Sequence, residues 1–338
     1  MGNKGQVIAV DAMGGDKGAE VSVAGALQAL EEIPSLRLKL VGGPEVLLPM
    51  LTGQSSAITD RIEVVPASEV VGMDERPRDA LRKKKDSSMR VAINLVRNGD
   101  ADACVSSGNT GALMATARFV LRTLPGIDRP AIISVVPAIG GHTHMLDLGA
   151  NADCTAAQLF QFAVMGSVVA TDIHGIARPK VGLLNIGEED IKGNELIREA
   201  GRLLSDSDLN YIGFVEGDDI FSGDVDVVVT DGFTGNVSLK TMEGVSHMVS
   251  AYMRSEFTRN ARNKLLGLLA SPVLRSLKNR LDPRRYNGAS LVGLTGIVIK
   301  SHGGADEFAF KNAIGTAMIE IDKGVPTQIS ELLRNQQV

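Results

Sequence analysis

The sequence predicts an α/β fold in which helices cover both faces of a mainly parallel sheet, a three-layer α/β/α arrangement. Short apolar runs alternate with amphipathic helical segments along most of the chain, which is the pattern of successive βαβ units. Polar, glycine-rich loops follow several of the apolar runs, and 37 glycines in 338 residues allow many tight connections. This length is compatible with one large domain or with two lobes.

Bulk composition narrows the class of protein. Hydrophobic residues make up 44% and charged residues 22%, as in an ordinary globular protein. No apolar stretch approaches the ~20 residues of a membrane span, and the first residues, MGNKGQVIAVD, lack a signal-peptide hydrophobic region. Cys104 and Cys154 lie in or beside apolar segments, so we expect reduced core cysteines and a cytoplasmic protein. A formal charge of −5 argues against a general nucleic-acid binder.

The first predicted βα unit has a strand at Val7 to Val10, a polar loop and a helix that ends near Glu32. Gly14, Gly15 and Gly18 in this loop do not form the GxGxxG dinucleotide fingerprint, and no GxxxxGK[ST] motif occurs in the chain. Two further strands are expected over Leu36 to Val41 and Ile62 to Val65.

The central motif is the stretch from residue 103 to residue 117, ACVSSGNTGALMATA. It predicts a strand, a polar turn over Ser106 to Gly111, and a helix. Glycines allow the backbone to approach a ligand, and the free N–H groups of a helix start favour an anion. Two later stretches, 183–200 and 227–244, repeat this design. Together they predict a composite site for a small anion.

The remaining strands are expected at Ala131 to Val136, Val181 to Ile186, Val225 to Thr230 and Ile297 to Lys300. Ligands of parallel sheets bind beyond the carboxyl ends of strands. We therefore expect all the polar loops to lie on one edge of the sheet. In the loop after Ile186, three acidic residues would repel a phosphate, so Lys192 and the 193–194 backbone are the better contacts.

The histidines do not predict a metal site. His142 and His144 are two residues apart, but no further His or Cys stands at ligand spacing, so we expect surface or loop histidines and no bound metal. His302 follows the last predicted strand, where either a substrate contact or a structural role is reasonable.

Two segments are strongly basic. Residues 75–90 contain seven basic residues against three acids, which indicates either a solvated helix face or a landing site for an acidic partner. Residues 254–285 contain nine basic residues and two acids, a local charge of +7 in a chain whose remainder is −12. Helical spacing there predicts two short amphipathic helices, a basic hairpin over 250–285, which either packs on the body or a second subunit, or meets an acidic protein or anionic lipid. Its candidate contact residues are Arg259, Arg262, Lys264, Arg275 and Lys278.

The polar loops do not match a hydrolase. There is no GxSxG, no His partner is identifiable for Ser106 or Ser107, and Cys104 falls within a strand. A site with neutral donors, one or two cations and no nucleophile of its own can bind phosphate and let the phosphate attack.

Seven motifs resemble those of one family, the bacterial phosphate acyltransferases (PlsX, acyl-[acyl-carrier-protein]:phosphate transacylase). They cover nearly the whole chain: VDAMGGDKG (10–18), SSGNTGA (106–112), LDLGAN (146–151), LLNIGEEDIKGNE (183–195), DGFTGNV (231–237), NGASLVGLTG (287–296) and KSHGGAD (300–306). The departures are mild: Ser107 stands where the family often has Ala, and Glu189 lies where Thr often precedes an acid.

The resemblance implies transfer of a long-chain acyl group from the carrier-protein thioester to inorganic phosphate. The acyl phosphate produced would feed a membrane acyltransferase of phospholipid synthesis. The resemblance further implies a cytoplasmic homodimer, partly associated with the inner face of the membrane and without a cofactor. Its fold would be related to phosphotransacetylases and to isocitrate and isopropylmalate dehydrogenases. We therefore expect residues 1–338 to form one α/β catalytic domain with the basic hairpin inserted in it.

The resemblance also suggests residue roles. Ser107, Gly108, Asn109 and Thr110 would cradle phosphate, and Lys192 would neutralise charge. Asn194 and Asn236 would orient the substrate or donate to its carbonyl oxygen. The remaining candidates, which shape the pocket or contact substrate, are Asp147, Asn151, Gly235 and His302.

Two other functions remain open from the sequence. An acyl-CoA phosphotransacylase could use the same fold, and a non-catalytic scaffold could bind the carrier protein or lipid. A dehydrogenase is a third reading, although no nucleotide fingerprint is visible.

Overall fold

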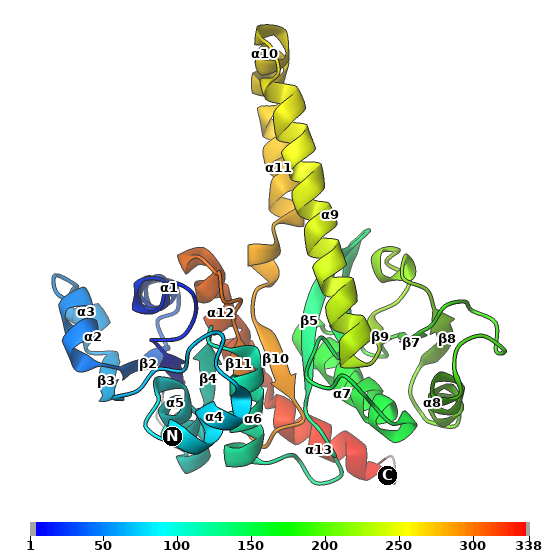
Figure 1. The fold of residues 1–338 in the computed structure, drawn as a ribbon, viewed down its shortest axis with the longest axis horizontal. Helices are drawn as coiled ribbons and strands as arrows, with labels where there is room; N and C mark the ends of the chain where they lie inside the picture. Colours follow the sequence, from blue (N-terminus) through cyan, green and yellow to red (C-terminus); the bar gives the residue numbers. More distant parts are fainter. Residues whose placement is uncertain (1–4, 336–338) are drawn as a thin grey trace.

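The computed structural model describes residues 5–335, and in this part of the chain eleven strands form a single sheet. Their spatial order is β3-β2-β1-β4-β11-β10-β5-β6-β9-β7-β8 (Figure 1). The strands are β1 Val7–Asp11, β2 Arg37–Gly42, β3 Ile62–Pro66, β4 Ala103–Ser106, β5 Ala131–Ala138, β6 Gly141–Leu146, β7 Val181–Leu184, β8 Tyr211–Val215, β9 Val227–Val229, β10 Ala289–Val292 and β11 Ile297–Lys300.

The sheet is mainly parallel, as predicted, but it consists of two parallel blocks that run in opposite directions. One block is β3-β2-β1-β4-β11 and the other is β6-β9-β7-β8. Strands β10 and β5 lie between them, and the three pairings β11–β10, β10–β5 and β5–β6 are antiparallel. Because three reversals separate the blocks, their carboxyl ends point to opposite edges of the sheet. The expectation that all polar loops share one edge is therefore wrong.

Helices cover both faces of the sheet, which confirms the three-layer prediction. Helices α4, α5, α6 and the base of α9 pack on one face, while α1, α12, α7, α8 and α13 pack on the other. Their bounds, with two 3₁₀ turns, are α1 Ala19–Glu32, α2 Pro44–Met50, α3 Ser56–Thr59, α4 Pro77–Lys83, α5 Ser88–Asn98, α6 Thr110–Leu121, α7 Ala156–His174, α8 Glu195–Ser205, η1 Asp219–Phe221, α9 Gly232–Thr258, α10 Ala261–Leu269, α11 Ser271–Leu281, η2 Pro283–Tyr286, α12 Glu307–Lys323 and α13 Val325–Asn335.

The apolar runs are buried because the central strands are covered on both sides. In β1, Ile8 and Val10 pack toward α1 and α12, whereas Ala9 packs on the opposite face toward α5 and α6. Cys104 is buried in β4, and burial raises the pKa of its thiol well above the ordinary value. Helix α7 contains a window, Ala156–Ile173, that is long and apolar enough to cross a membrane, but 78% of it is buried in the fold, as in a core helix.

The basic hairpin projects from the body as an arm made of α9, α10 and α11 (Figure 1). Its first helix is the continuous 27-residue α9, which begins directly after β9. Ser271 is the first residue of α11, and Pro272 lies in its first turn. Arg259, Arg262, Lys264 and Arg275 are exposed on this arm, and the side chain of Lys278 lies outside the described residues.

Candidate functional site

The first group of polar residues lies at the carboxyl ends of β1, β4 and β11. Asp11, the last residue of β1, is buried and accepts hydrogen bonds from the hydroxyls of Ser88 and Ser106, each at 2.6 Å. Burial raises the pKa of the Asp11 carboxyl, and these hydrogen bonds oppose the rise. Asp11 thus joins the start of α5 to the end of β4.

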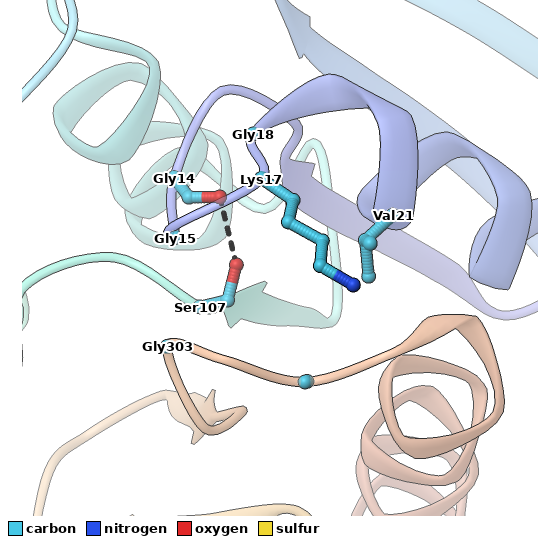
Figure 2. A pocket seen from close by; sticks show the side chains of 8 residues that line it. Gly14, Gly15, Lys17, Gly18, Val21, Ser107 and Gly303 are labelled. Carbon is cyan, nitrogen blue, oxygen red and sulfur yellow. Dashed lines mark hydrogen bonds between the residues drawn. The ribbon is translucent and has the colours of Figure 1, made fainter.

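The loops after β1 and β4 are in close contact. Ser106 Oγ accepts from the Gly108 N–H (3.0 Å), and Ser107 Oγ donates to the Gly14 carbonyl (2.8 Å), as Figure 2 shows for the second bond. Gly15 has φ +91°, and a Cβ there would lie 2.5 Å from Ser107 Oγ. Glycine is required at this position by both its backbone conformation and the close approach of the loops.

Figure 2 also shows a shallow hollow beside these loops, with the Lys17 side chain extending toward Val21 and the 303–305 segment. Its lining residues are Gly14, Gly15, Lys17, Gly18, Val21, Ser107, Gly303 and Ala305.

Asn109 has a structural role at the start of α6. Its Oδ1 accepts from the Ala112 N–H (2.9 Å), which caps the helix. Its Nδ2 donates to the carbonyls of Met73 (2.7 Å) and Glu75 (3.1 Å). This side chain therefore holds the 73–75 segment, while Thr110 is exposed in the first turn of α6.

Lys300 belongs to the same group and is absent from the sequence-based set. It is the last residue of β11, paired with Ser106 of β4, and only 8% exposed. Its ammonium group donates to the Ser107 carbonyl at 3.4 Å and contacts the Ser301 carbonyl. Burial lowers the pKa of Lys300 to about 8, against the opposing effects of Asp11 and Asp16. A lysine that ends an apolar strand was the sequence signal for this position.

His302 follows Lys300. Its Nδ1 accepts from the Gly304 N–H at 3.1 Å, and its backbone N–H donates to Asn287 Oδ1 at 2.9 Å. Burial lowers the pKa of the His302 ring, and the nearby Lys240 ammonium lowers it further. The ring is therefore held within its own loop.

The second group lies at the carboxyl ends of β6, β9 and β7. Asp147, directly after β6, is fully buried, and burial raises the pKa of its carboxyl. Its oxygens accept hydrogen bonds from the backbone N–H groups of Ile132, Gly149, Ala150 and Asn151 and from the Asn151 carboxamide. Asp147 and Asn151 thus shape the loop from inside rather than facing a ligand.

Helix α9 begins tightly against this loop. A Cβ at Gly235 would lie 1.9 Å from the Asp147 carbonyl oxygen, so only glycine fits there. One residue later, Asn236 is exposed, and its Cβ would lie 3.4 Å from a Cβ at Gly149. The Asn236 carboxamide makes no hydrogen bond to another described residue.

The loop after β7 places Lys192 and Asn194 at the same edge. Asn194 caps α8, because its Oδ1 accepts from the Ile197 N–H at 2.9 Å. Lys192 lies over Gly187, where a Cβ would be 3.0 Å from Lys192 Cγ. The Lys192 ammonium group is exposed and makes no ion pair within residues 5–335.

Helix α9 extends from the second group toward the first. Lys240, one turn after Asn236, forms a 2.8 Å ion pair with Glu243, and its charge lowers the pKa of both Lys300 and His302. Residues four apart share a helix face. Asn236 and Lys240 therefore link the two edges along one side of α9.

The structure brings together Ser107, Gly108, Asn109, Thr110 and His302 in the first group. It brings together Asp147, Asn151, Lys192, Asn194, Gly235 and Asn236 in the second. The expectation of surface or loop histidines is wrong, since His144 is fully buried and both His142 and His144 lie in β6. Within the described part of the chain, no three His, Cys, Asp or Glu side chains gather as a metal site would require.

Comparisons with known proteins cover the part of the chain that contains both polar groups. The family model described as "Fatty acid synthesis protein" matches residues 6–328. The phosphate acyltransferase of Alkalilimnicola ehrlichii is 62% identical over 328 residues, which are 97% of this chain and 96% of the relative. That of Legionella pneumophila (strain Paris) is 53% identical over 334 residues, covering 98% and 96%.

Solved structures share the fold at low identity. A phosphotransacetylase from Streptococcus pyogenes has a TM-score of 0.63 and 20% identity, covering 94% of each chain. A putative 4-hydroxythreonine-4-phosphate dehydrogenase from Salmonella typhimurium has a TM-score of 0.55 and 14% identity, covering 93% of this chain and 98% of that one. These confirm the expected relation to phosphotransacetylase and dehydrogenase folds. The family match over residues 6–328 and the high identities show that the chain belongs to the phosphate acyltransferase (PlsX) family of lipid-synthesis enzymes.

Proposed function

We propose that this enzyme transfers a long-chain acyl group from acyl-[acyl-carrier-protein] to inorganic phosphate without a cofactor. An oxygen of bound phosphate attacks the thioester carbonyl carbon, the carbon–sulfur bond breaks, and the carrier leaves as its thiol. The proton carried by hydrogen phosphate ends on the departing sulfur. The products are an acyl phosphate and free carrier protein.

One observation carries this proposal: Lys192 and Asn236 are exposed donors at one sheet edge that no described residue engages. Their neighbours Asp147 and Asn194 are occupied in holding backbone N–H groups. The Lys192 ammonium would neutralise phosphate charge, and the Asn236 amide would donate to the oxyanion that forms on the carbonyl oxygen. The 106–110 loop would contribute to substrate binding from the first polar group, which Lys240 of α9 adjoins.

The test mixes enzyme, acyl-carrier thioester and phosphate, and traps acyl phosphate with hydroxylamine. Lys192→Ala and Asn236→Ala should each lower kcat/KM by 10²-fold or more, the typical effect of removing an oxyanion donor. Lys323→Ala, at the far end of α12, controls for loss of one exposed lysine. Full activity in both variants, with normal folding, would contradict these roles.

The substrates separate the rival functions. A preference for the CoA thioester over the carrier thioester would instead indicate an acyl-CoA phosphotransacylase. Absence of phosphate-dependent cleavage with either thioester would indicate a scaffold that binds carrier protein or lipid.

We further propose that the arm contacts the inner face of an anionic membrane, beside a downstream membrane acyltransferase, in a cytoplasmic homodimer. Five exposed leucines and one exposed valine lie next to its basic residues, namely Leu265, Leu266, Leu268, Leu269, Leu277 and Val273. A basic residue near an anionic surface contributes about 1 kcal/mol. Reversing the charge of Arg259, Arg262 and Lys264 should therefore weaken binding to anionic vesicles at least tenfold. The proposed homodimer is a separate point, and sedimentation velocity of the wild-type protein tests it.

A further inference from the structure

The α4 basic face consists of five exposed basic residues on one short helix and its flanks: Arg76, Arg78, Arg82, Lys83 and Lys85. Neighbouring acids neutralise little of this charge. Glu75 pairs with the partly buried Lys84 at 2.6 Å, and Asp79 pairs with Lys83 at 3.0 Å. The three arginines and Lys85 make no ion pair within residues 5–335, although Asp79 also lies near Arg76 and Arg78, so the face keeps a net positive charge.

This face is held beside the first polar group. The Asn109 carboxamide donates to the carbonyls of Met73 and Glu75, directly before α4. A Cβ at Gly111 would lie 2.9 Å from Pro77 Cγ, and one at Gly303 would lie 2.7 Å from Met73 Cε. Segment 73–77 therefore touches both the start of α6 and the loop after β11.

Hydrogen bonds within the segment also hold the α4 basic face in place. Lys84, directly after α4, donates to the Val70 carbonyl (2.5 Å) and the Glu75 carboxylate (2.6 Å). The hydrogen bond from Lys84 lowers the pKa of Glu75, and the two bonds together hold the segments on either side of the helix. A partner would thus meet basic side chains on a helix that is anchored at both ends.

The arm is less suitable for delivering a substrate. Helix α9 has 27 residues, so at 1.5 Å per residue it extends about 40 Å. Its far end, at α10, points away from the body in Figure 1, whereas α4 lies on the body against α6. A carrier on α4 would lie beside the first polar group, and α9 connects that group to Asn236 through Lys240, whose charge acts on Lys300 and His302.

We propose that the α4 basic face is the docking surface for the acidic carrier protein that presents the acyl thioester. The inference rests on the proposed transacylase function and assigns that function's protein substrate a place on this chain. Opposite charge steers such encounters and raises association rates by 10- to 10³-fold, with strong dependence on salt.

The test replaces Arg76, Arg78 and Arg82 together by Glu. The apparent KM for the acyl-carrier thioester should rise at least tenfold, with kcat retained, and its dependence on salt should weaken. The KM for a small acyl thioester that lacks the carrier should not change. The milder pair Arg78→Gln with Arg82→Gln should give an intermediate KM, and thermal unfolding checks that each variant folds.

The matched control reverses three other exposed basic residues, Arg97, Arg202 and Lys323, and should leave the carrier KM unchanged. An unchanged KM in the Arg76, Arg78 and Arg82 variant would overturn the proposal. The proposal would also be overturned if the α4 variant showed no rise in the carrier KM while this KM rose tenfold in the control variant or in the arm variant of Arg259, Arg262 and Lys264.

Direct binding of the acyl-free carrier to the enzyme, measured by fluorescence anisotropy, separates this proposal from the proposed function. If no thioester yields acyl phosphate, the transacylase function fails. Docking is then still decided by whether the triple α4 variant loses carrier binding at least tenfold relative to the control variant.

Discussion

Glu320 should make the protein less stable as the pH rises from about 4.5 to about 7. This residue of α12 is 2% exposed and faces β10, where Ser290 Oγ donates to Oε2 at 3.0 Å. Its other oxygen, Oε1, has no hydrogen-bond partner among the described residues. Burial raises the pKa of this carboxyl from 4.5 to about 7, because a charged form there lacks solvation.

The magnitude follows from linkage between proton binding and folding. Between the two pKa values the folded state binds more protons than the unfolded state, so the free energy of unfolding falls as pH rises. Each pKa unit corresponds to about 1.4 kcal/mol. The raised pKa of Glu320 therefore gives a contribution of about 3 kcal/mol that is present below pH 4.5 and lost above pH 7.

Glu320→Gln tests this reasoning, since the carboxamide keeps the shape and stays neutral. Urea unfolding at pH 5 and pH 8 gives the free energies. The variant should resemble the wild-type protein at pH 5 and exceed it by up to about 3 kcal/mol at pH 8. Glu331→Gln, at an exposed position, controls for loss of one charge. An equal difference between Glu320→Gln and wild type at both pH values would refute the argument.

Three further substitutions test the candidate site. Gly235→Ala would place Cβ 1.9 Å from the Asp147 carbonyl oxygen and should cost about 1–3 kcal/mol in urea unfolding, whereas Gly244→Ala, with open space, should stabilise α9 by up to about 1 kcal/mol. Ser106→Ala leaves both the Asp11 carboxylate and the Gly108 N–H short of a hydrogen-bond partner, so it should raise the KM for phosphate. Ser107→Ala removes a single hydrogen bond, which costs about 1 kcal/mol, and should raise this KM less. Equal effects of the two variants on the KM would contradict the assignment. Asp147→Asn replaces an acceptor of five hydrogen bonds and should lower the free energy of unfolding by about 3 kcal/mol, and an unchanged midpoint would show that these bonds are dispensable.

The sequence by itself determined the layers, the elements and the chemical character of the loops. Apolar runs such as Val7 to Val10 predict buried strands, and the Ser106–Gly111 turn predicts a polar strand-to-helix loop, because these signals are local. The charge of the arm and of α4 is equally visible in the chain, as is the resemblance to the acyltransferase family.

Only the tertiary structure decided which polar loops meet. The periodicity of a strand sets which side chains share a face, but it does not set the direction in which distant strands pair. The antiparallel insertion of β10 and β5 separates the loop after β4 from the loops after β6, β9 and β7.

The use of each polar side chain is likewise a tertiary property. The Asn109 side chain donates to the backbone carbonyls of Met73 and Glu75, and the Lys300 ammonium group donates to the Ser107 carbonyl. In each case the two partners are dozens of residues or more apart in the sequence. Such partners depend on long-range packing, so the sequence does not show that the Asn109 side chain is engaged or that Lys300 lies beside the 106–110 loop. Lys192 and Asn236 remain the exposed donors because the structure assigns them no internal partner among residues 5–335.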